Sequence, residues 1–301
     1  MFRKLPFFSV QTKVALIIIY NNRYDRNIDV VEKLYKNRFT DIFHLMPFYD
    51  GDKSNVIPVY ENSRYFQGYI AQGLKSFFKE SYEHYFFIAD DLILNPIINE
   101  KNYKEIFKLD METNFIPHLD YPNNYFWYWN KNIIEYKIEI AGIECKNLLP
   151  DYNEALKKMK SFGIKNEYIE AENIYLDERK KSGERYKPQY PVARSYSDIA
   201  IVSKYSIKKF CHFCGIFAAT HLFVECALPT SLILACKKII FEKDLLLRGR
   251  ALWTKEDYEI LEKYQQNLKK LLDDFPKNYI YLHPIKLSKW NTEDICKESL
   301  L

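Results

Sequence analysis

Residues 13–20, KVALIIIY, form an unbroken apolar run after the lysine, and most of them are β-branched or aromatic. A strand that is apolar on both faces has to be covered on both sides, as the central strands of α/β sheets are. The run is too short to span a membrane, since a spanning helix needs about 20 apolar residues. We therefore expect these residues to form a strand that is buried between helices.

The segments that follow alternate in character, with helices expected at residues 28–35 and 66–77 and strands at 41–47, 55–60 and 85–89. Asp25 or Asn27 is a candidate N-cap for the first helix. Pro58 cannot donate a ladder hydrogen bond, which places its strand at an edge of the sheet. This order predicts an α/β fold with a Rossmann-like mixed sheet flanked by helices.

The C-terminal part of the chain shows the same alternation. We expect a strand at residues 197–204, a helix at 215–239 that Pro229 breaks, a long amphipathic helix at 254–271 that Thr254 caps, and a strand at 279–282. On the apolar face of the long helix we place Tyr258, Leu261, Tyr264, Leu268 and Leu271.

Residues 99–191 are less regular and are interpreted as an insertion. They contain two charged helical segments, at 153–162 and 167–181, and the aromatic stretch YPNNYFWYWN at 121–130. Without repeats or a low-complexity linker, we expect one domain, 1–301, in which residues 1–98 and 192–301 form the two halves of the sheet.

Charge and cysteine content exclude several classes of protein. The net charge of +4 comes from 44 basic and 40 acidic residues without long single-sign blocks, so no nucleic-acid partner is expected. The six cysteines lack the spacing of a disulfide framework, and the CxxC of Cys211 and Cys214 lacks a second ligand pair, so reduced thiols are expected. No transmembrane segment is expected, which favours a cytoplasmic protein, either free or attached at the inner face of the membrane.

The stretch HYFFIADDLILNP, residues 84–96, ends an apolar strand on two adjacent carboxylates, Asp90 and Asp91. Two carboxylates repel each other, and burying them is costly unless a positive charge compensates. Mg²⁺ or Mn²⁺ is the usual compensation, because hard cations prefer oxygen ligands and also bind diphosphates. For an isolated acid pair, a helix cap beside a solvated carboxylate is the alternative.

The position of this pair resembles the acidic DxD motif of GT-A-fold glycosyltransferases, although Ala89 stands where a strict motif has its first acid. The resemblance implies that Asp91 binds the metal and that Asp90 contacts the sugar nucleotide. It also implies that residues 1–98 are the nucleotide-binding half, that the insertion flanks the acceptor, and that Tyr20 and Asn21, after the first strand, receive the base.

A second motif, HPIKLSKW at residues 283–290, is similar to the His-x-x-Gly-x-x-Lys-Pro-Trp motif of glycogenin-like transferases. It lacks the glycine and the proline. The resemblance implies that His283 binds the metal and that Lys286, Lys289 and Trp290 contact the donor, with a lysine neutralising the departing diphosphate. Asp91 and His283 should then meet in space, and a basic strand end is the alternative.

Two further acids are candidate catalytic residues. Glu225 lies among apolar side chains, and in inverting relatives an acid of a late helix deprotonates the acceptor; His221, four residues earlier, is a candidate partner. Asp198 heads a strand where relatives carry a polar residue that touches sugar or acceptor. A salt bridge or cap at Glu225 and a turn at Asp198 are the structural alternatives.

These features predict a metal-dependent glycosyltransferase that moves a sugar from a UDP-sugar to a glycan hydroxyl, typically in surface polysaccharide biosynthesis. A nucleotidyltransferase is one alternative, although the loop after the first strand has no glycine. A non-catalytic glycan-binding protein that uses the aromatic stretch 121–130 is another.

Overall fold

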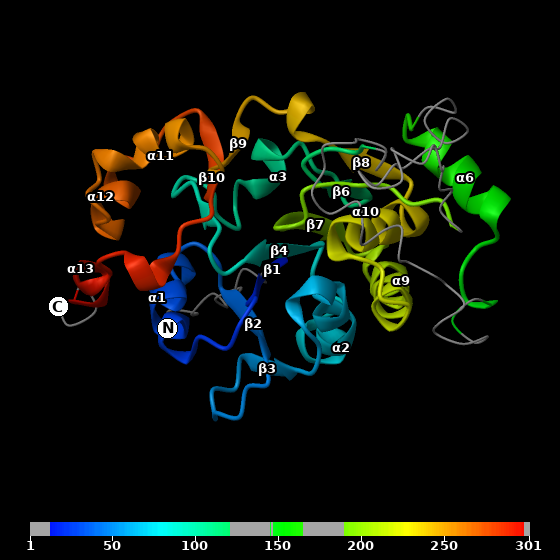
Figure 1. Cartoon of the computed structure of the whole chain (residues 1–301), viewed down its shortest axis with the longest axis horizontal. Coiled ribbons are helices and arrows are strands. Elements are labelled where there is room, and N and C mark those ends of the chain that lie inside the picture. Colours follow the sequence, from blue (N-terminus) through cyan, green and yellow to red (C-terminus); the bar gives the residue numbers. More distant parts are fainter. Residues whose placement is uncertain (1–12, 121–144, 146, 165–189, 298–301) are drawn as a thin grey trace, which may run out of the picture.

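The computed structural model describes residues 13–120, 145, 147–164 and 190–297 (Figure 1). Its larger sheet has seven strands in the order β3-β2-β1-β4-β7-β6-β8, with bounds β1 Val14–Ile19, β2 Asp41–Pro47, β3 Val56–Val59, β4 His84–Ala89, β6 Thr113–Phe115, β7 Ile199–Ser203 and β8 Lys238–Ile240. Only β7 among these seven runs against the others. The expected α/β fold with a mixed sheet is therefore present, with β3 at an edge.

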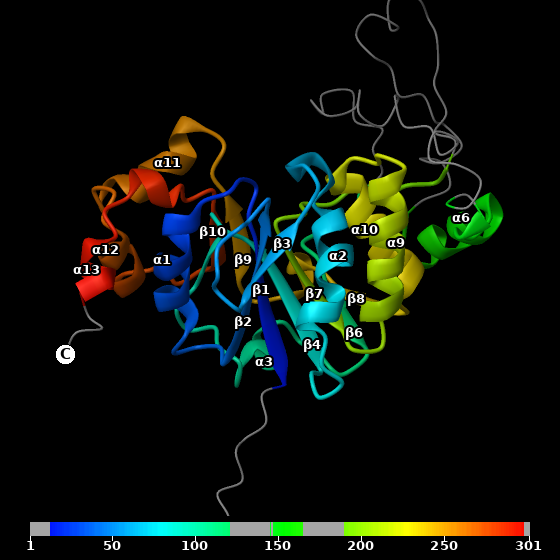
Figure 2. The ribbon, with the colours of Figure 1, turned by 90° about the horizontal axis from the view of Figure 1, so that it is seen from below.

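Helices cover both faces of this sheet (Figure 2). On one side lie α2 (Gln67–Phe77), α9 (Ile207–Ala219) and α10 (Val224–Ala235), and on the other lie α1 (Asp25–Tyr35), α11 (Lys255–Glu262), α12 (Leu268–Asp273) and α13 (Glu293–Lys297). Alternate residues of β1 enter two separate core clusters, Val14, Leu16 and Ile18 in one and Ala15, Ile17 and Ile19 in the other. The apolar run is thus buried from both sides, as its composition predicts.

A smaller sheet of three strands, β5 (Ile93–Leu94), β10 (Tyr279–His283) and β9 (Arg248–Ala251), lies beside the larger one. β10 pairs with β5 in antiparallel and with β9 in parallel orientation. The remaining elements are α3 (Tyr103–Ile106), α6 (Tyr152–Ser161) and the 3₁₀ turns η1 (Ser63–Tyr65), η3 (Glu242–Asp244) and η4 (Leu287–Lys289). The small sheet matters because it ties the C-terminal strand to the segment that follows β4.

The structure corrects the expected break in the helix at 215–239. The break lies between α9 and α10, where His221 has a positive φ of 57° and stacks on Tyr65 at 5.1 Å, whereas Pro229 lies inside α10. Pro229 has no N–H for the Glu225 carbonyl, and the Ser195 N–H donates to that carbonyl instead, at 3.0 Å. A partner distant in sequence therefore makes the proline tolerable.

Two other local predictions are also wrong. α1 begins after Tyr24 without a side-chain cap, because the Asp25 carboxylate accepts hydrogen bonds from Arg23 and Asn27 is buried inside the helix. The long helix at 254–271 is two helices, since Gln265 and Gln266 have positive φ values of 51° and 54° between α11 and α12. Thr254 does cap α11, as expected.

Residues 99–191 are not wholly an insertion, because β6 (Thr113–Phe115) belongs to the larger sheet, and the stretch after β6 is described in part. The helix expected at 153–162 is present as α6, whereas the aromatic stretch 121–130 and the helix expected at 167–181 lie outside the described residues. Cys211 and Cys214 are buried free thiols on α9. No helix in the described ranges is long and apolar enough to cross a membrane.

Candidate functional site

The carboxyl ends of β1 and β4 meet the start of β7 at one edge of the larger sheet. Strand order reverses at this point, because β2 lies on one side of β1 and β4 on the other. Open α/β sheets bind ligands in the crevice beyond such a switch point. β7 runs antiparallel to β4, so Asp198 is at the same edge, and its carbonyl accepts a hydrogen bond from the Ala89 N–H at 2.9 Å.

A pocket of about 200 Å³ occupies this edge. We call it the charged pocket, and its polar lining consists of Asn21, Asp90, Asp91, Asp198, His283 and Lys286. Trp253, which is 73% exposed, forms part of its wall and lies 6.1 Å from the Tyr196 ring. Six polar residues from four separate stretches of the chain therefore share one small cavity.

Asp91 and His283 are in direct contact, with 2.9 Å between Asp91 Oδ1 and His283 Nε2. β5 follows Asp91 almost immediately and pairs with β10, which ends at His283. The Ile285 N–H also donates to the Asp91 carbonyl at 2.7 Å, which fixes the two segments side by side. The prediction that these distant residues meet is confirmed.

Lys286 and Asp198 complete the electrostatics around this contact. The Lys286 ammonium donates to Asp91 Oδ2, and Asp198 Oδ1 lies 3.8 Å from His283 Nε2. Burial alone would raise the pKa of Asp91, but its hydrogen bonds with His283 and Lys286 lower it below the ordinary value. Burial would likewise lower the pKa of His283, and the Asp198 and Asp91 carboxylates raise it instead.

Asp90 and Asp198 are less well compensated than Asp91. Asp90 is 6% exposed, and burial together with the neighbouring Asp91 charge raises its pKa to about 7. Burial also raises the pKa of Asp198, and the nearby His283 offsets only part of this effect. Three carboxyl groups thus share one imidazole and one ammonium, which leaves the charged pocket with a surplus of acid.

Tyr196, which no sequence motif marks, orients the imidazole. Its hydroxyl contacts His283 Nδ1, and its ring stacks on Tyr281 at 6.0 Å with an angle of 4° between the rings. Burial and the nearby Asp198 carboxylate raise the pKa of Tyr196, so its hydroxyl stays protonated. With Nδ1 held by Tyr196, Nε2 faces Asp91.

The structure does not bring all the predicted residues to this pocket. The prediction that Tyr20 receives the nucleotide base is wrong, because its ring is fully buried and its hydroxyl contacts His44 Nδ1 at 3.0 Å. The neighbouring Asn21 does line the charged pocket. His221 and Glu225 do not lie one turn apart on the same helix as expected, because His221 lies in the break before α10. Glu225 occupies the first turn of α10, and its charge contributes to the raised pKa of Tyr196.

Lys289 and Trp290 line a second pocket, of about 610 Å³, next to the first. Tyr258, Glu262 and Gln266 also line it, and we call it the aromatic pocket. The two pockets share Pro284 and Lys286 in their walls. Of the two lysines of the C-terminal motif, Lys286 is therefore the one at the acid pair.

The carboxylates and the imidazole of the charged pocket are chemically suited to binding a hard divalent cation. Carboxylates and a neutral imidazole are ligands of Mg²⁺ and Mn²⁺, and such an ion would stabilise the ionised Asp90 that burial disfavours. Within the described part of the chain, no group of three His, Cys, Asp or Glu side chains is arranged as a metal site. A cation at Asp91 would have to compete with Lys286 for the carboxylate.

Comparison with known proteins adds no assignment to this geometry. The charged pocket and the position of its residues at the switch point are therefore the basis for any statement about function. No protein-family model matches the chain, and no curated protein matches its sequence.

Proposed function

We propose that the chain is a GT-A-like, metal-dependent glycosyltransferase that moves a sugar from a nucleoside diphosphate donor, a UDP-sugar, to a hydroxyl of a glycan. The observation that carries the proposal is the 2.9 Å contact of Asp91 and His283 at the switch point of the sheet. Acid and imidazole come from opposite halves of the chain and are held there by the pairing of β5 with β10. The resemblance requires the DxD-like and C-terminal motifs to meet at this edge of the sheet, and the contact of Asp91 with His283 supports the proposal.

Asp91 and His283 would hold the metal ion, and a bound Mn²⁺ or Mg²⁺ would offset the charge of the donor's diphosphate. The chain's own residues account for the rest of the site. Asn21 and Asp90 lie at the carboxyl ends of β1 and β4, on the side where such sheets receive a nucleotide. The half-exposed Lys286 ammonium is placed to neutralise the departing diphosphate.

Asp198 is the better candidate for the group that accepts the proton of the acceptor hydroxyl. It lines the charged pocket, whereas Glu225 does not line either pocket described above. Burial raises the pKa of Asp198, which makes its carboxylate a stronger base than an exposed one. The acceptor oxygen bonds to the anomeric carbon as the bond from that carbon to the diphosphate oxygen breaks.

A thermal-shift experiment tests this proposal. The melting temperature of the full chain is measured with UDP, CDP, GDP and UDP-sugars, each with and without Mn²⁺. We expect UDP compounds to raise the melting temperature only when Mn²⁺ is present, because ligands that bind the folded state stabilise it. The Asp91→Asn variant should lose this stabilisation.

Asp52→Asn is the matched control, since it removes an exposed carboxylate that lines neither of the two pockets. It should respond to UDP and Mn²⁺ like the unmodified chain. Indifference to every nucleotide would contradict the proposal, and so would a UDP response that survives in Asp91→Asn. Binding without hydrolysis or transfer of any UDP-sugar would favour the non-catalytic alternative.

A further inference from the structure

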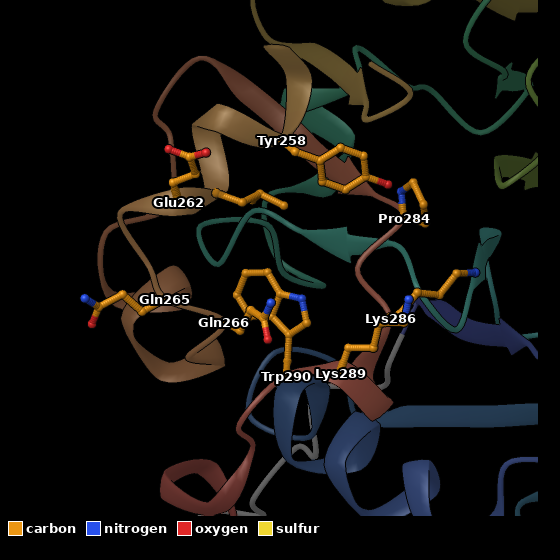
Figure 3. Close-up of a pocket in the computed structure, with 9 residues that line it drawn as sticks. Tyr258, Glu262, Gln265, Gln266, Pro284, Lys286, Lys289 and Trp290 are labelled. Carbon is orange, nitrogen blue, oxygen red and sulfur yellow. The ribbon is translucent and has the colours of Figure 1, made fainter. Parts of the chain in front are cut away.

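The aromatic pocket differs from the charged pocket in size and chemistry. Its volume of about 610 Å³ falls within the range of roughly 300–1,000 Å³ typical of small-molecule sites, whereas the charged pocket, at about 200 Å³, falls below it. Figure 3 shows the pocket between α11, which supplies Tyr258, and the segment after β10, which supplies Trp290. The charged pocket alone is thus too small for both substrates of a transfer reaction.

The lining of the aromatic pocket suits a sugar. Tyr258 is 46% exposed and Trp290 is partly buried against the core, so each offers ring surface to a ligand. The C–H faces of a pyranose pack on aromatic rings, and its hydroxyls need donors and acceptors. Glu262 and Gln266 supply these, because their side chains have no hydrogen-bonding or ionic partner among the described residues.

The net charge of the pocket also favours a neutral, hydroxyl-rich ligand. Three charged side chains line the cavity, the Glu262 carboxylate and the ammonium groups of Lys286 and Lys289, and the Lys286 ammonium is paired with Asp91. In Figure 3 the Lys286 side chain extends away from Trp290, and Lys286 contacts Asp91 of the charged pocket.

The backbone of the pocket wall is strained at Gln265 and Gln266, which have consecutive positive φ values. The wall is nevertheless held in place, because the Asn291 N–H donates to the Gln266 carbonyl at 2.7 Å and the Leu268 N–H donates to the Asn291 carbonyl at 3.0 Å. Strain that persists in a fixed wall is a feature of binding sites, where it positions side chains before a ligand arrives.

We infer that the aromatic pocket binds the saccharide acceptor, so that a hydroxyl of the bound sugar reaches the charged pocket past Pro284 and Lys286. The identification of this saccharide as the acceptor rests on the proposed function. The binding of a saccharide rests on the rings, the unpaired polar groups and the shape of the pocket itself.

The test is calorimetric titration of the full chain with methyl glycosides of glucose, galactose, mannose and N-acetylglucosamine, and with lactose, maltose and chitobiose. We expect at least one of these probes to bind. Tyr258→Ala should weaken that binding roughly tenfold, whereas Tyr258→Phe, which keeps the ring, should stay within about threefold. Tyr205→Ala removes a tyrosine that is 61% exposed outside the pocket and should change nothing.

Gln266→Gly adds a variant in which loss of binding is not explained by loss of the fold. Glycine accepts a positive φ without strain, so the melting temperature should be unchanged or higher. Saccharide binding should nevertheless weaken, because the side-chain amide is lost. Equal binding by Gln266→Gly and by the unmodified chain would overturn the assigned role of this amide in the pocket.

The remaining outcomes separate the inference from the proposed function. If no saccharide probe binds, or if Tyr258→Ala weakens binding of UDP and not of a saccharide, the inference is overturned. UDP binding in the presence of Mn²⁺, measured on the same variants, should be unaffected by Tyr258→Ala. If saccharide binding depends on Tyr258 while UDP never binds, the pocket is a saccharide site and the transferase proposal fails.

Discussion

The described residues contain two clusters in which an imidazole lies between a phenol and a carboxylate. In the first, His44 Nδ1 contacts the Tyr20 hydroxyl at 3.0 Å and Nε2 contacts Glu32 at 2.7 Å. In the second, His283 has the same two contacts, with Tyr196 and with Asp91. The residue types and the pattern of contacts are alike, yet only the second is proposed as an active site.

The two clusters differ in their balance of charge and in their place on the sheet. His44 is fully buried within β2, and Glu32 also accepts a hydrogen bond from Asn55 at 2.5 Å, so one carboxylate serves one imidazole. The His283 cluster lies at the switch point and lines a cavity that also holds Asp90, Asp198 and Lys286. Surplus acid facing a cavity distinguishes a site from a structural cluster better than the residue types do.

Replacing each histidine by alanine should separate the clusters most strongly. We expect His283→Ala to lower the rate of UDP-sugar turnover about 100-fold or more, since it removes a proposed metal ligand. We expect His44→Ala to lower the free energy of unfolding by about 2–4 kcal/mol, because it leaves the buried Tyr20 hydroxyl without a partner and leaves the Glu32 carboxylate with only its hydrogen bond from Asn55. Turnover assays and urea unfolding of both variants check these values.

Each variant is the other's control. His44→Ala should retain the turnover of the unmodified chain per folded molecule, and His283→Ala should lose less stability than His44→Ala because His283 faces a cavity that water can enter. The comparison breaks if the two variants lose turnover to the same extent, or if His283→Ala is the less stable protein.

Much of the fold could be predicted because its signals are local. β1 to β4 follow from apolar runs and from helical spacing, and Pro58 marks the edge strand. The helix breaks could not be predicted, since they depend on distant partners. The Glu225 carbonyl that Pro229 leaves without a donor is satisfied by Ser195, and the turn at Gln266 is tied to Asn291.

The candidate site also contains residues that local sequence signals predict and residues that only distant contacts place. The sequence predicts Asp90 and Asp91 at the carboxyl edge, because they directly follow a buried strand. Tyr196 and Trp253 cannot be predicted in the same way, because their positions depend on the antiparallel direction of β7 and on the pairing of β9 with β10. The separation of Lys286 from Lys289 depends on the η4 turn, which the sequence did not reveal.

Asp90, which lines the same cavity as the His283 cluster, and Glu32 of the His44 cluster should respond to pH with opposite signs. Burial and Asp91 raise the pKa of Asp90 to about 7, so the folded state binds a proton that the unfolded state has released, and stability falls as pH rises from about 4 to 7. In the absence of divalent metal, Asp90→Asn should therefore unfold with a free energy roughly 1–4 kcal/mol higher than the unmodified chain at pH 8, since each pKa unit corresponds to about 1.36 kcal/mol. The gain should shrink towards pH 4.

Glu32→Gln is the control of opposite sign. Burial would raise the pKa of Glu32, but its hydrogen bond with His44 lowers it below 4.5, so its stabilisation is present above that value and disappears as pH falls. Glu32→Gln should destabilise the chain at pH 7, and this loss of stability should shrink as pH falls below 4.5. Urea unfolding measured from about pH 4 to pH 8 tests both variants. If the gain in free energy of unfolding for Asp90→Asn does not depend on pH, titration of Asp90 is excluded as its cause.

Removal of the two tyrosine hydroxyls should give the smallest effects and the finest distinction. Tyr196→Phe and Tyr20→Phe each delete one hydrogen bond to an imidazole Nδ1, which should lower the free energy of unfolding by about 1 kcal/mol in either case. Tyr196→Phe should also weaken Mn²⁺-dependent UDP binding about tenfold, because the ring of His283 is no longer held with Nε2 towards Asp91. Tyr20→Phe should leave that binding unchanged, and calorimetry of both variants with UDP and Mn²⁺ measures the difference. Equal losses of UDP binding would mean that Tyr196 supports the fold and does not position His283.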